Sequence, residues 1–409
     1  MNITIILKRQ FALRITLLLI LILIVVFASS RLRADTGTCS GQNLTLPFID
    51  VPANNIFFCQ IASAFFTGLS NGTTATTFSP SATVTREQMA AFITRTQDSA
   101  LKRGSRRASA GQWATPQDVG ALKTTTVGSN PQFNCFDGED IWVPNFDNGS
   151  ITRVHASDGR VLGTWTGATN AFSTIAAAGF IYVTGQQIPG KIYRIDPTQA
   201  PGAVTEVENN LGANPRSITY DGLNLWTANL GTAGAGSITR YNIVTDTETT
   251  FTTGFNQPAG IVFDGTHLWV VDRGDDALYR VNPADGAILE TLNLGTITSF
   301  IAIPVFDGAN IWVPVENGIN VVSTSTPARL LATMTGNGLG IENRAVAFDG
   351  ERIMVTNNSG VVLLWKASSL APLGNLNLAA GMTPQGVCSD GLHFWITANT
   401  SGNDFLMRF

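Results

Sequence analysis

The sequence predicts an all-β chain, a seven-bladed β-propeller preceded by a small α-helical module. From residue 129 onward, an aromatic residue, Asp-Gly, two variable residues, an apolar residue and Trp recur as a motif. The glycines of successive copies, which fix the spacing of the motif, are Gly138, Gly179, Gly222, Gly265, Gly308, Gly350 and Gly391. Steps of about 40–45 residues with short strands are typical of propeller blades. The 40 glycines and only 13% charged residues also favour short strands joined by tight turns.

The chain begins with the pattern of an export signal. Lys8, Arg9 and Arg14 precede an apolar run from Ile15 to Ala28, which is short for a spanning helix of about 20 residues. We expect residues 1–34 to be a signal peptide cleaved after Ala34. Cleavage after Ala28 and an uncleaved signal anchor, the one route to a membrane contact, are the alternatives. In each case the remaining chain lies outside the cytoplasm.

Composition narrows the function classes. The formal net charge of −4 leaves no basic excess to neutralise phosphates, so no nucleic-acid partner is expected. Only three histidines occur, and no two are close in sequence, so we expect no metal site and no cofactor.

Residues 35–97 predict the helical module. The segments in order are Phe48–Pro52, an apolar helix over Phe57–Phe66, a turn over Gly68–Gly72, Phe78–Pro80, and a second helix within Thr83–Arg95. Thr85 and Gln88 have the spacing of a capping box. Met89, Phe92 and Ile93 have the spacing of a buried helix face.

These segments, Phe48-Ile49-Asp50-Val51-Pro52 and Thr85-Arg86-Glu87 above all, resemble a single S-layer homology module. The resemblance implies attachment to cell-wall polysaccharide, with Asp50, Thr85, Arg86 and Glu87 as the contact residues. Arg86 at a helix N-terminus would suit a sugar carboxylate. The alternative is that Asp50 and Thr85 only cap and orient the helices.

A basic linker is expected over residues 98–118, where Lys102, Arg103, Arg106 and Arg107 cluster among small residues. Its charge could contact anionic envelope polymers, or it could simply be a solvated spacer.

The propeller is expected over residues 119–409. In each repeat, strand a precedes Asp-Gly, strand b contains the Trp, and strands c and d follow. Asp-Gly predicts a two-residue hairpin with positive φ at both positions. The repeated Trp predicts blade-to-blade packing, and Arg153, Arg194, Arg240 and Arg280 are predicted to face solvent from strand c.

The last repeat ends after its strand c, whereas residues 120–127 have the pattern of a strand d. We therefore expect this N-terminal strand to complete the last blade and so remove its open edge.

Four cysteines form two candidate disulfide pairs. Cys39 and Cys59 lie in the module, and Cys135 and Cys388 lie on the inner strands of neighbouring blades. The alternative is four buried thiols that behave as small apolar side chains.

The Asp-Gly and Trp repeats resemble NHL/YVTN-type propellers and, within them, streptogramin-lyase-like proteins. That likeness implies a lyase with a repeated W-F-T-E motif, a catalytic His and an acid that holds Mg²⁺. The repeated Glu is missing here, and His155, His267 and His393 are not expected beside a second titratable group.

The ends of the b strands predict a polar binding surface for a glycan or protein, because propellers commonly bind ligands at that face. Its residues are Asn145, Asn229, Asp272 and Asn357, with Arg273 and Glu316 nearby. The alternative is that these Asn and Asp residues only start the b–c turns.

We therefore expect a non-catalytic protein, secreted to the cell envelope or surface of a bacterium. The module would bind cell-wall polysaccharide while the propeller presents a binding face. A secreted propeller lyase or lactonase, or a scaffold without a small ligand, is the alternative.

Overall fold

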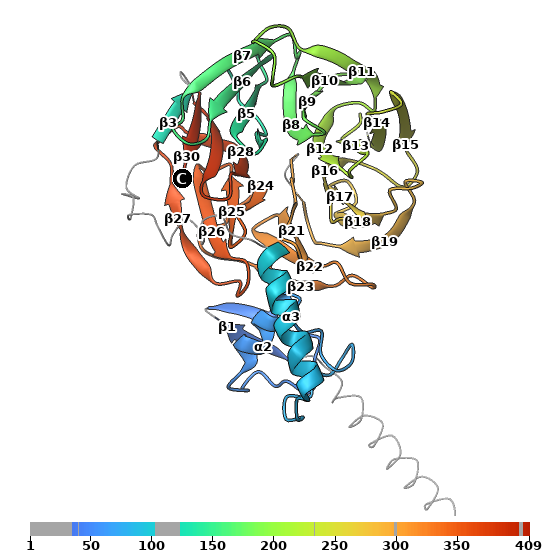
Figure 1. Ribbon diagram of the computed structural model, residues 1–409, viewed down its shortest axis with the longest axis vertical. Coiled ribbons are helices and arrows are strands. Elements are labelled where there is room, and N and C mark those ends of the chain that lie inside the picture. The colour runs from blue at the N-terminus through green and yellow to red at the C-terminus, as the bar shows by residue number, and fades with distance from the viewer. Residues whose placement is uncertain (1–34, 40, 103–122, 233, 298–300, 401–403) are drawn as a thin grey trace, which may run out of the picture.

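Seven four-stranded antiparallel sheets form a ring (Figure 1), so the predicted fold class is confirmed. The computed structural model describes residues 35–39, 41–102, 123–232, 234–297, 301–400 and 404–409. The predicted signal peptide (residues 1–34) and residues 103–118 of the predicted linker lie outside the described residues. No helix of the described ranges is both long enough and apolar enough to cross a membrane.

The blades follow the chain, each running from inner strand a to outer strand d. Blade 1 is β4 (Cys135–Phe136), β5 (Asp140–Asn145), β6 (Ser150–His155) and β7 (Val161–Thr166). Blade 2 is β8 (Ala171–Ala177), β9 (Phe180–Gly185), β10 (Gly190–Ile195) and β11 (Thr205–Leu211). Blade 3 is β12 (Pro215–Tyr220), β13 (Asn224–Asn229), β14 (Ser237–Asn242) and β15 (Thr247–Phe251).

The ring continues in the same order. Blade 4 is β16 (Pro258–Phe263), β17 (Leu268–Asp272), β18 (Ala277–Val281) and β19 (Ile288–Asn293). Blade 5 is β20 (Val305–Phe306), β21 (Asn310–Val315), β22 (Gly318–Ser323) and β23 (Leu330–Met334). Blade 6 is β24 (Asn343–Phe348), β25 (Arg352–Asn357), β26 (Val361–Lys366) and β27 (Pro372–Asn377).

Blade 7 closes the ring with strands from both ends of the propeller sequence. It consists of β28 (Thr383–Ser389), β29 (Phe394–Asn399), β30 (Phe405–Arg408) and β3 (Lys123–Thr126). β3 pairs antiparallel with β30, and Thr124 lies opposite Met407. The predicted closure is therefore confirmed, with the outer strand supplied from the N-terminal side.

The Asp-Gly turns differ from the predicted geometry. In blade 1, Gly138 has φ +109°, but Asp137 is not among the residues with positive φ. The Asp137 carboxylate instead accepts the backbone N–H groups of Glu139 (2.9 Å) and Asp140 (2.8 Å). Both turn residues have positive φ only in the degenerate copy, at Ala178 and Gly179, where the Asp is missing.

The second carboxylate oxygen of the turn Asp accepts the indole N–H of the strand-b Trp. This bond recurs as Asp137–Trp142 (2.7 Å), Asp221–Trp226 (2.7 Å), Asp264–Trp269 (2.7 Å), Asp307–Trp312 (2.8 Å) and Asp390–Trp395 (2.9 Å). In blade 6, where Met354 replaces Trp, Arg352 Nε donates to Asp349 Oδ2 at 2.7 Å. The motif therefore couples the tight turn to the core residue of its own blade.

The five indoles are buried in clusters that join neighbouring blades, which confirms the predicted packing role of the Trp. Trp269, for example, is fully buried with Ile311 and Val313 of blade 5. Trp395 packs with Ile141 and Val143 of blade 1 in the same way. Burial of each large ring therefore stabilises a blade and its contact with the next one.

The prediction that the strand-c arginines face solvent is wrong. Arg153 and Arg280 lie over the rings of Trp142 and Trp269, with Cζ 5.1 and 4.7 Å from the ring centroids. Arg153 also donates to Pro197 O of blade 2 at 2.8 Å, and Arg240 donates to Ala284 O of blade 4 at 2.8 Å. The long apolar stem covers the indole while the guanidinium reaches a carbonyl of the next blade.

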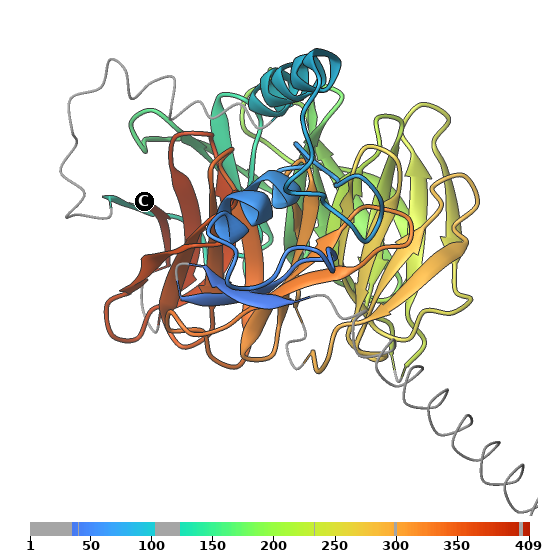
Figure 2. The same ribbon diagram turned by 90° about the horizontal axis from the view of Figure 1, so that it is seen from below.

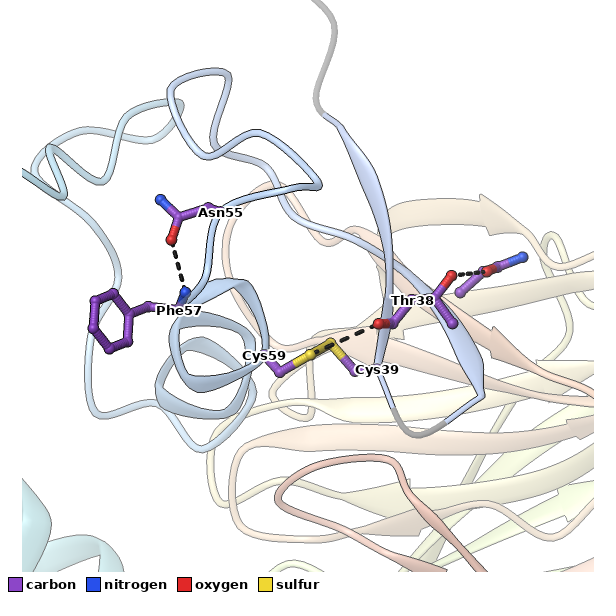
Figure 3. The surroundings of a disulfide bond; sticks show 6 residues. Thr38, Cys39, Asn55, Phe57 and Cys59 are labelled. Carbon is purple, nitrogen blue, oxygen red and sulfur yellow. Dashed lines mark hydrogen bonds between the residues drawn. A yellow bond between two sulfur atoms is a disulfide. The ribbon is translucent and has the colours of Figure 1, made fainter.

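The N-terminal module contains β1 (Thr36–Cys39), β2 (Gln42–Thr45), α2 (Phe58–Phe66) and α3 (Arg86–Lys102). A disulfide joins Cys39 to Cys59, and so links β1 to α2 (Figure 3). The predicted capping box of α3 is present: Thr85 N–H donates to Gln88 Oε1 (2.9 Å) and Gln88 N–H to Thr85 Oγ1 (3.2 Å).

The buried helix face predicted for Met89, Phe92 and Ile93 is wrong. Met89 is 50% exposed and Ile93 63% exposed. Figure 2 shows why, because α3 stands apart from α2. These apolar residues therefore have the spacing of a buried helix face, but the described part of the module does not bury them.

The module packs against the outside of blades 5 and 6. Phe48, Phe58 and Phe66 share one buried cluster with Trp312 and Met334. Asn310 Nδ2 donates to Phe66 O at 2.7 Å within this buried contact. Figure 1 shows the module, drawn in blue, at the rim of the ring beside blades 5 and 6. The module and the propeller therefore share part of their core.

The second candidate disulfide, Cys135–Cys388, is not formed, because both residues are free thiols. They lie on the inner strands of blades 1 and 7, each paired within its own blade. Cys388 Sγ instead accepts from Asn134 Nδ2 at 3.2 Å. Burial raises the pKa of Cys135 to about 12, so the thiol stays protonated and unreactive at neutral pH.

Replacement of the turn Asp tests its structural role. Asp264→Ala removes the acceptor for Thr266 N–H, His267 N–H and the Trp269 indole. We expect a loss of about 2–4 kcal/mol in unfolding free energy, measured by urea denaturation. The exposed Asp285 accepts only the Ala287 N–H among the bonds described, so Asp285→Ala should cost less than about 1 kcal/mol. Equal losses in the two variants would contradict the proposed role.

Candidate functional site

The four b-strand ends predicted to form a binding surface are fully buried, each with an exposed fraction of 0%. Asn145 Nδ2 donates to Ser150 Oγ and Thr152 Oγ1, both at 3.0 Å. Asn229 Nδ2 donates to Ser237 Oγ (3.1 Å) and Thr239 Oγ1 (2.9 Å) in the same way. These amides tie the end of strand b to strand c.

The side chains of Asp272 and Asn357 also form hydrogen bonds with nearby backbone groups. The Asp272 carboxylate accepts the N–H groups of Asn256 (2.8 Å), Gln257 (2.9 Å) and Gly274 (2.9 Å). Burial raises the pKa of Asp272 despite these bonds. Asn357 Nδ2 donates to Ile341 O at 3.0 Å and Asn343 Oδ1 at 2.7 Å. All four side chains are buried rather than presented at the face, as a polar binding surface would require. The bonds of Asn145 and Asn229 to strand c, and of Asp272 to Gly274 N–H, fit the alternative role in the b–c turns.

Arg273 and Glu316 are the two members of the predicted surface that remain partly exposed. Arg273 Nη1 donates to Gln257 Oε1 at 2.6 Å. The Glu316 backbone N–H donates to Thr296 O at 3.0 Å. Both residues directly follow a strand b, at the end of the ring where strands b lead into strands c. We call this end of the ring the b–c face.

Two arginines that the sequence interpretation missed lie at the same face. Arg216 and Arg344 follow the first residue of the inner strands β12 and β24, where the pairing with strand b shifts register. Their contacts cross between blades. Arg216 Cζ lies 5.0 Å from the ring centroid of Phe172 in blade 2, and Arg344 Nη1 donates to Gln385 Oε1 of blade 7.

Neutral amides supply most of the acceptors for these cations. When the side-chain amide of Gln186 is oriented with its oxygen toward Arg216, that oxygen accepts a hydrogen bond from Arg216 Nη2 at 2.8 Å. Arg344 Nη2 donates to Asn358 Oδ1 at 2.7 Å. We define the axial cluster by two sets of contacts at this face. One set is Phe172, Gln186, Arg216 and Arg273 in blades 2 to 4, and the other is Arg344, Asn358 and Gln385 in blades 6 and 7.

Arg216 and Arg344 of the axial cluster differ in their charged neighbours, because Glu342 lies near Arg344 and accepts a hydrogen bond from Asn358 Nδ2. Burial and then the nearby charge of Arg273 lower the pKa of Arg216 to about 10. Burial also lowers the pKa of Arg344, which Glu342 partly offsets. The Arg216 guanidinium remains charged at neutral pH, and no carboxylate of the described residues forms an ion pair with it. An anionic ligand would therefore gain from contact here.

The four predicted contact residues of the module fall into two groups. Both Asp50 carboxylate oxygens accept backbone N–H groups, from Phe78 (2.8 Å) and Ser79 (2.7 Å). Thr85 caps α3 through the box described above. Arg86 and Glu87 are exposed in the first turn of α3. Asp50 and Thr85 thus have structural contacts, while Arg86 and Glu87 are accessible to a ligand.

Two histidines do lie beside a carboxylate, contrary to the prediction. His155 Nδ1 is 2.7 Å from Asp140 Oδ1, and His393 Nδ1 is 3.3 Å from Asp390 Oδ2. Burial alone would raise the pKa of Asp390, but hydrogen bonds from His393, Trp395 and the backbone outweigh it and lower the pKa to about 2. These pairs lie around the a–b turns, away from the axial cluster.

Within the described ranges, His, Cys, Asp and Glu form no group of three or more that could hold a metal ion.

Comparison with known proteins supports the fold. No family model and no curated protein matches the sequence. Among solved structures, hydrazine synthase from Kuenenia stuttgartiensis is similar, with a TM-score of 0.57 and 17% sequence identity. The alignment covers 72% of this chain and 99% of that chain. At this level of identity, the similarity shows the propeller fold alone.

The role of Asp272 as a backbone acceptor can be tested with its amide. Asp272→Asn keeps the shape but turns an NH₂ group toward a backbone N–H. We expect a loss of about 1–2 kcal/mol in unfolding free energy, measured by urea denaturation. Asp147→Asn, an exposed carboxylate after strand b of blade 1, is the control and should change stability by less than about 0.5 kcal/mol. Unchanged stability in Asp272→Asn would show that the carboxylate is not needed.

Proposed function

We propose that this protein is exported to the envelope of a bacterium, where it binds anionic glycan without catalysing a reaction. The axial cluster is the observation that carries the proposal. It presents Arg216, with no carboxylate partner among the described residues, beside the aromatic ring of Phe172. Phe172 is itself buried and supports the guanidinium from below, and a guanidinium recognises carboxylate or phosphate groups.

Export is supported by the N-terminal sequence and by the Cys39–Cys59 disulfide, which suits an oxidising compartment. Wall attachment is supported by the resemblance of the module to an S-layer homology module. Arg86 and Glu87, at the exposed start of α3, are the residues through which the module would bind wall polysaccharide.

Attachment is tested by sedimentation of the purified mature chain with isolated cell-wall sacculi. We expect Arg86→Ala to lower the bound fraction about tenfold, because an exposed charge-assisted contact is lost without disturbing the core. Arg160→Ala is the control, since Arg160 is a surface arginine of blade 1 with a side-chain exposure of 68%. Equal binding by both variants would overturn attachment through α3.

The axial cluster is tested separately with a soluble probe. We expect Arg216→Gln to weaken binding of a galacturonate hexamer about tenfold in calorimetry, and to reduce the salt dependence. A neutral galactose hexamer should bind neither protein, and Arg160→Gln should behave as wild type. If the wild type and Arg216→Gln bind the galacturonate hexamer with equal affinity, the proposed ligand class is contradicted.

A further inference from the structure

A cavity of about 550 Å³ lies where the module meets blade 5. Its walls come from the α2 end of the module, from Arg95 of α3, and from the a–b and c–d turns of blade 5. This volume is in the usual range for small-molecule sites. We call it the seam cavity.

The lining of the seam cavity is rich in groups that recognise sugars and anions. Arg95 and Arg329 supply two guanidiniums, Phe65 an aromatic ring, and Asn71 and Thr326 an amide and a hydroxyl. No Asp or Glu lines the cavity, and neither arginine forms an ion pair with a carboxylate of the described residues. The cavity is therefore positively charged and polar on most sides.

The walls are held by buried contacts, so the cavity does not depend on one flexible loop. On the module side, Asn310 Nδ2 fixes the end of α2 through Phe66 O at 2.7 Å. On the propeller side, Arg280 Nη1 donates to Thr326 Oγ1 at 2.7 Å, and Glu290 Oε1 accepts Ala328 N–H at 2.9 Å. Arg280 and Glu290 belong to blade 4, which thereby anchors the c–d turn of blade 5.

We propose that the seam cavity binds a saccharide unit carrying a carboxylate or a phosphate group. Arg95 and Arg329 hold the anionic group, Phe65 contacts the apolar face of the sugar ring, and Asn71 and Thr326 meet its hydroxyls. Because the ligand would touch both the module and blade 5, its binding would stabilise the contact between them. This site is separate from the axial cluster and does not depend on it.

The test uses calorimetry on the mature chain carrying Arg216→Gln, so that the axial cluster does not contribute. The probes are galacturonic acid dimer, glucose 1-phosphate and neutral galactose dimer. We expect one or both anionic probes to bind and the neutral dimer not to bind. Binding of only one anionic probe identifies whether carboxylate or phosphate is preferred.

Arg95→Gln and Arg329→Gln are each expected to weaken binding about tenfold, whereas the exposed Arg160→Gln should not change it. Both replaced side chains line the cavity without carboxylate partners, so the fold should be retained, which the unfolding midpoint checks. The proposal is overturned if no probe binds, if the neutral dimer binds equally well, or if neither substitution weakens binding. Wall attachment that Arg86→Ala leaves unchanged, with probe binding intact, would count against the function of α3 and not against this site.

Discussion

The pairing of β3 with β30 is the constraint on which the architecture depends. It completes the seventh sheet and covers an edge that would otherwise present unpaired backbone groups. Closure holds the seven blades in a ring, so each indole can be buried against the following blade. It also places the inner strands around one axis, where Arg216 and Arg344 contact residues of neighbouring blades.

The sequence alone was sufficient for the number of blades, the packing of the tryptophans and the origin of the last strand. Each of these features either recurs through the repeats or completes the last one, so the regular spacing of the Asp-Gly motif is enough to predict it. The spacing did not predict the geometry of the Asp-Gly turns. The Asp137 carboxylate accepts hydrogen bonds from the backbone and from Trp142, and this favours a turn in which only the Gly has a positive φ. The position of Arg280 was also missed, since its hydrogen bonds to Thr324 and Thr326 reach into the next blade.

The candidate site was predicted less well, for a physical reason. Asn145 and Asn229 occupy equivalent positions and make the same link between strands b and c of their own blades, so their repetition indicates a scaffold role. The residues of the proposed binding site are instead those that break the repeat, as Arg216 and Arg344 do where blade 2 has Phe172 and blade 7 has Gln385. The seam cavity has no sequence signal, because Arg95 and Arg329 meet only through the packing of the module on blade 5.

Hydrogen–deuterium exchange of the mature chain tests ring closure most directly. The closed ring predicts that the amides of β3 that face β30 exchange as slowly as those of β30, and that both strands lose protection together as denaturant is added. Exchange of residues 123–126 at the rate of an unstructured peptide, while residues 405–408 remain protected, would contradict the closed ring.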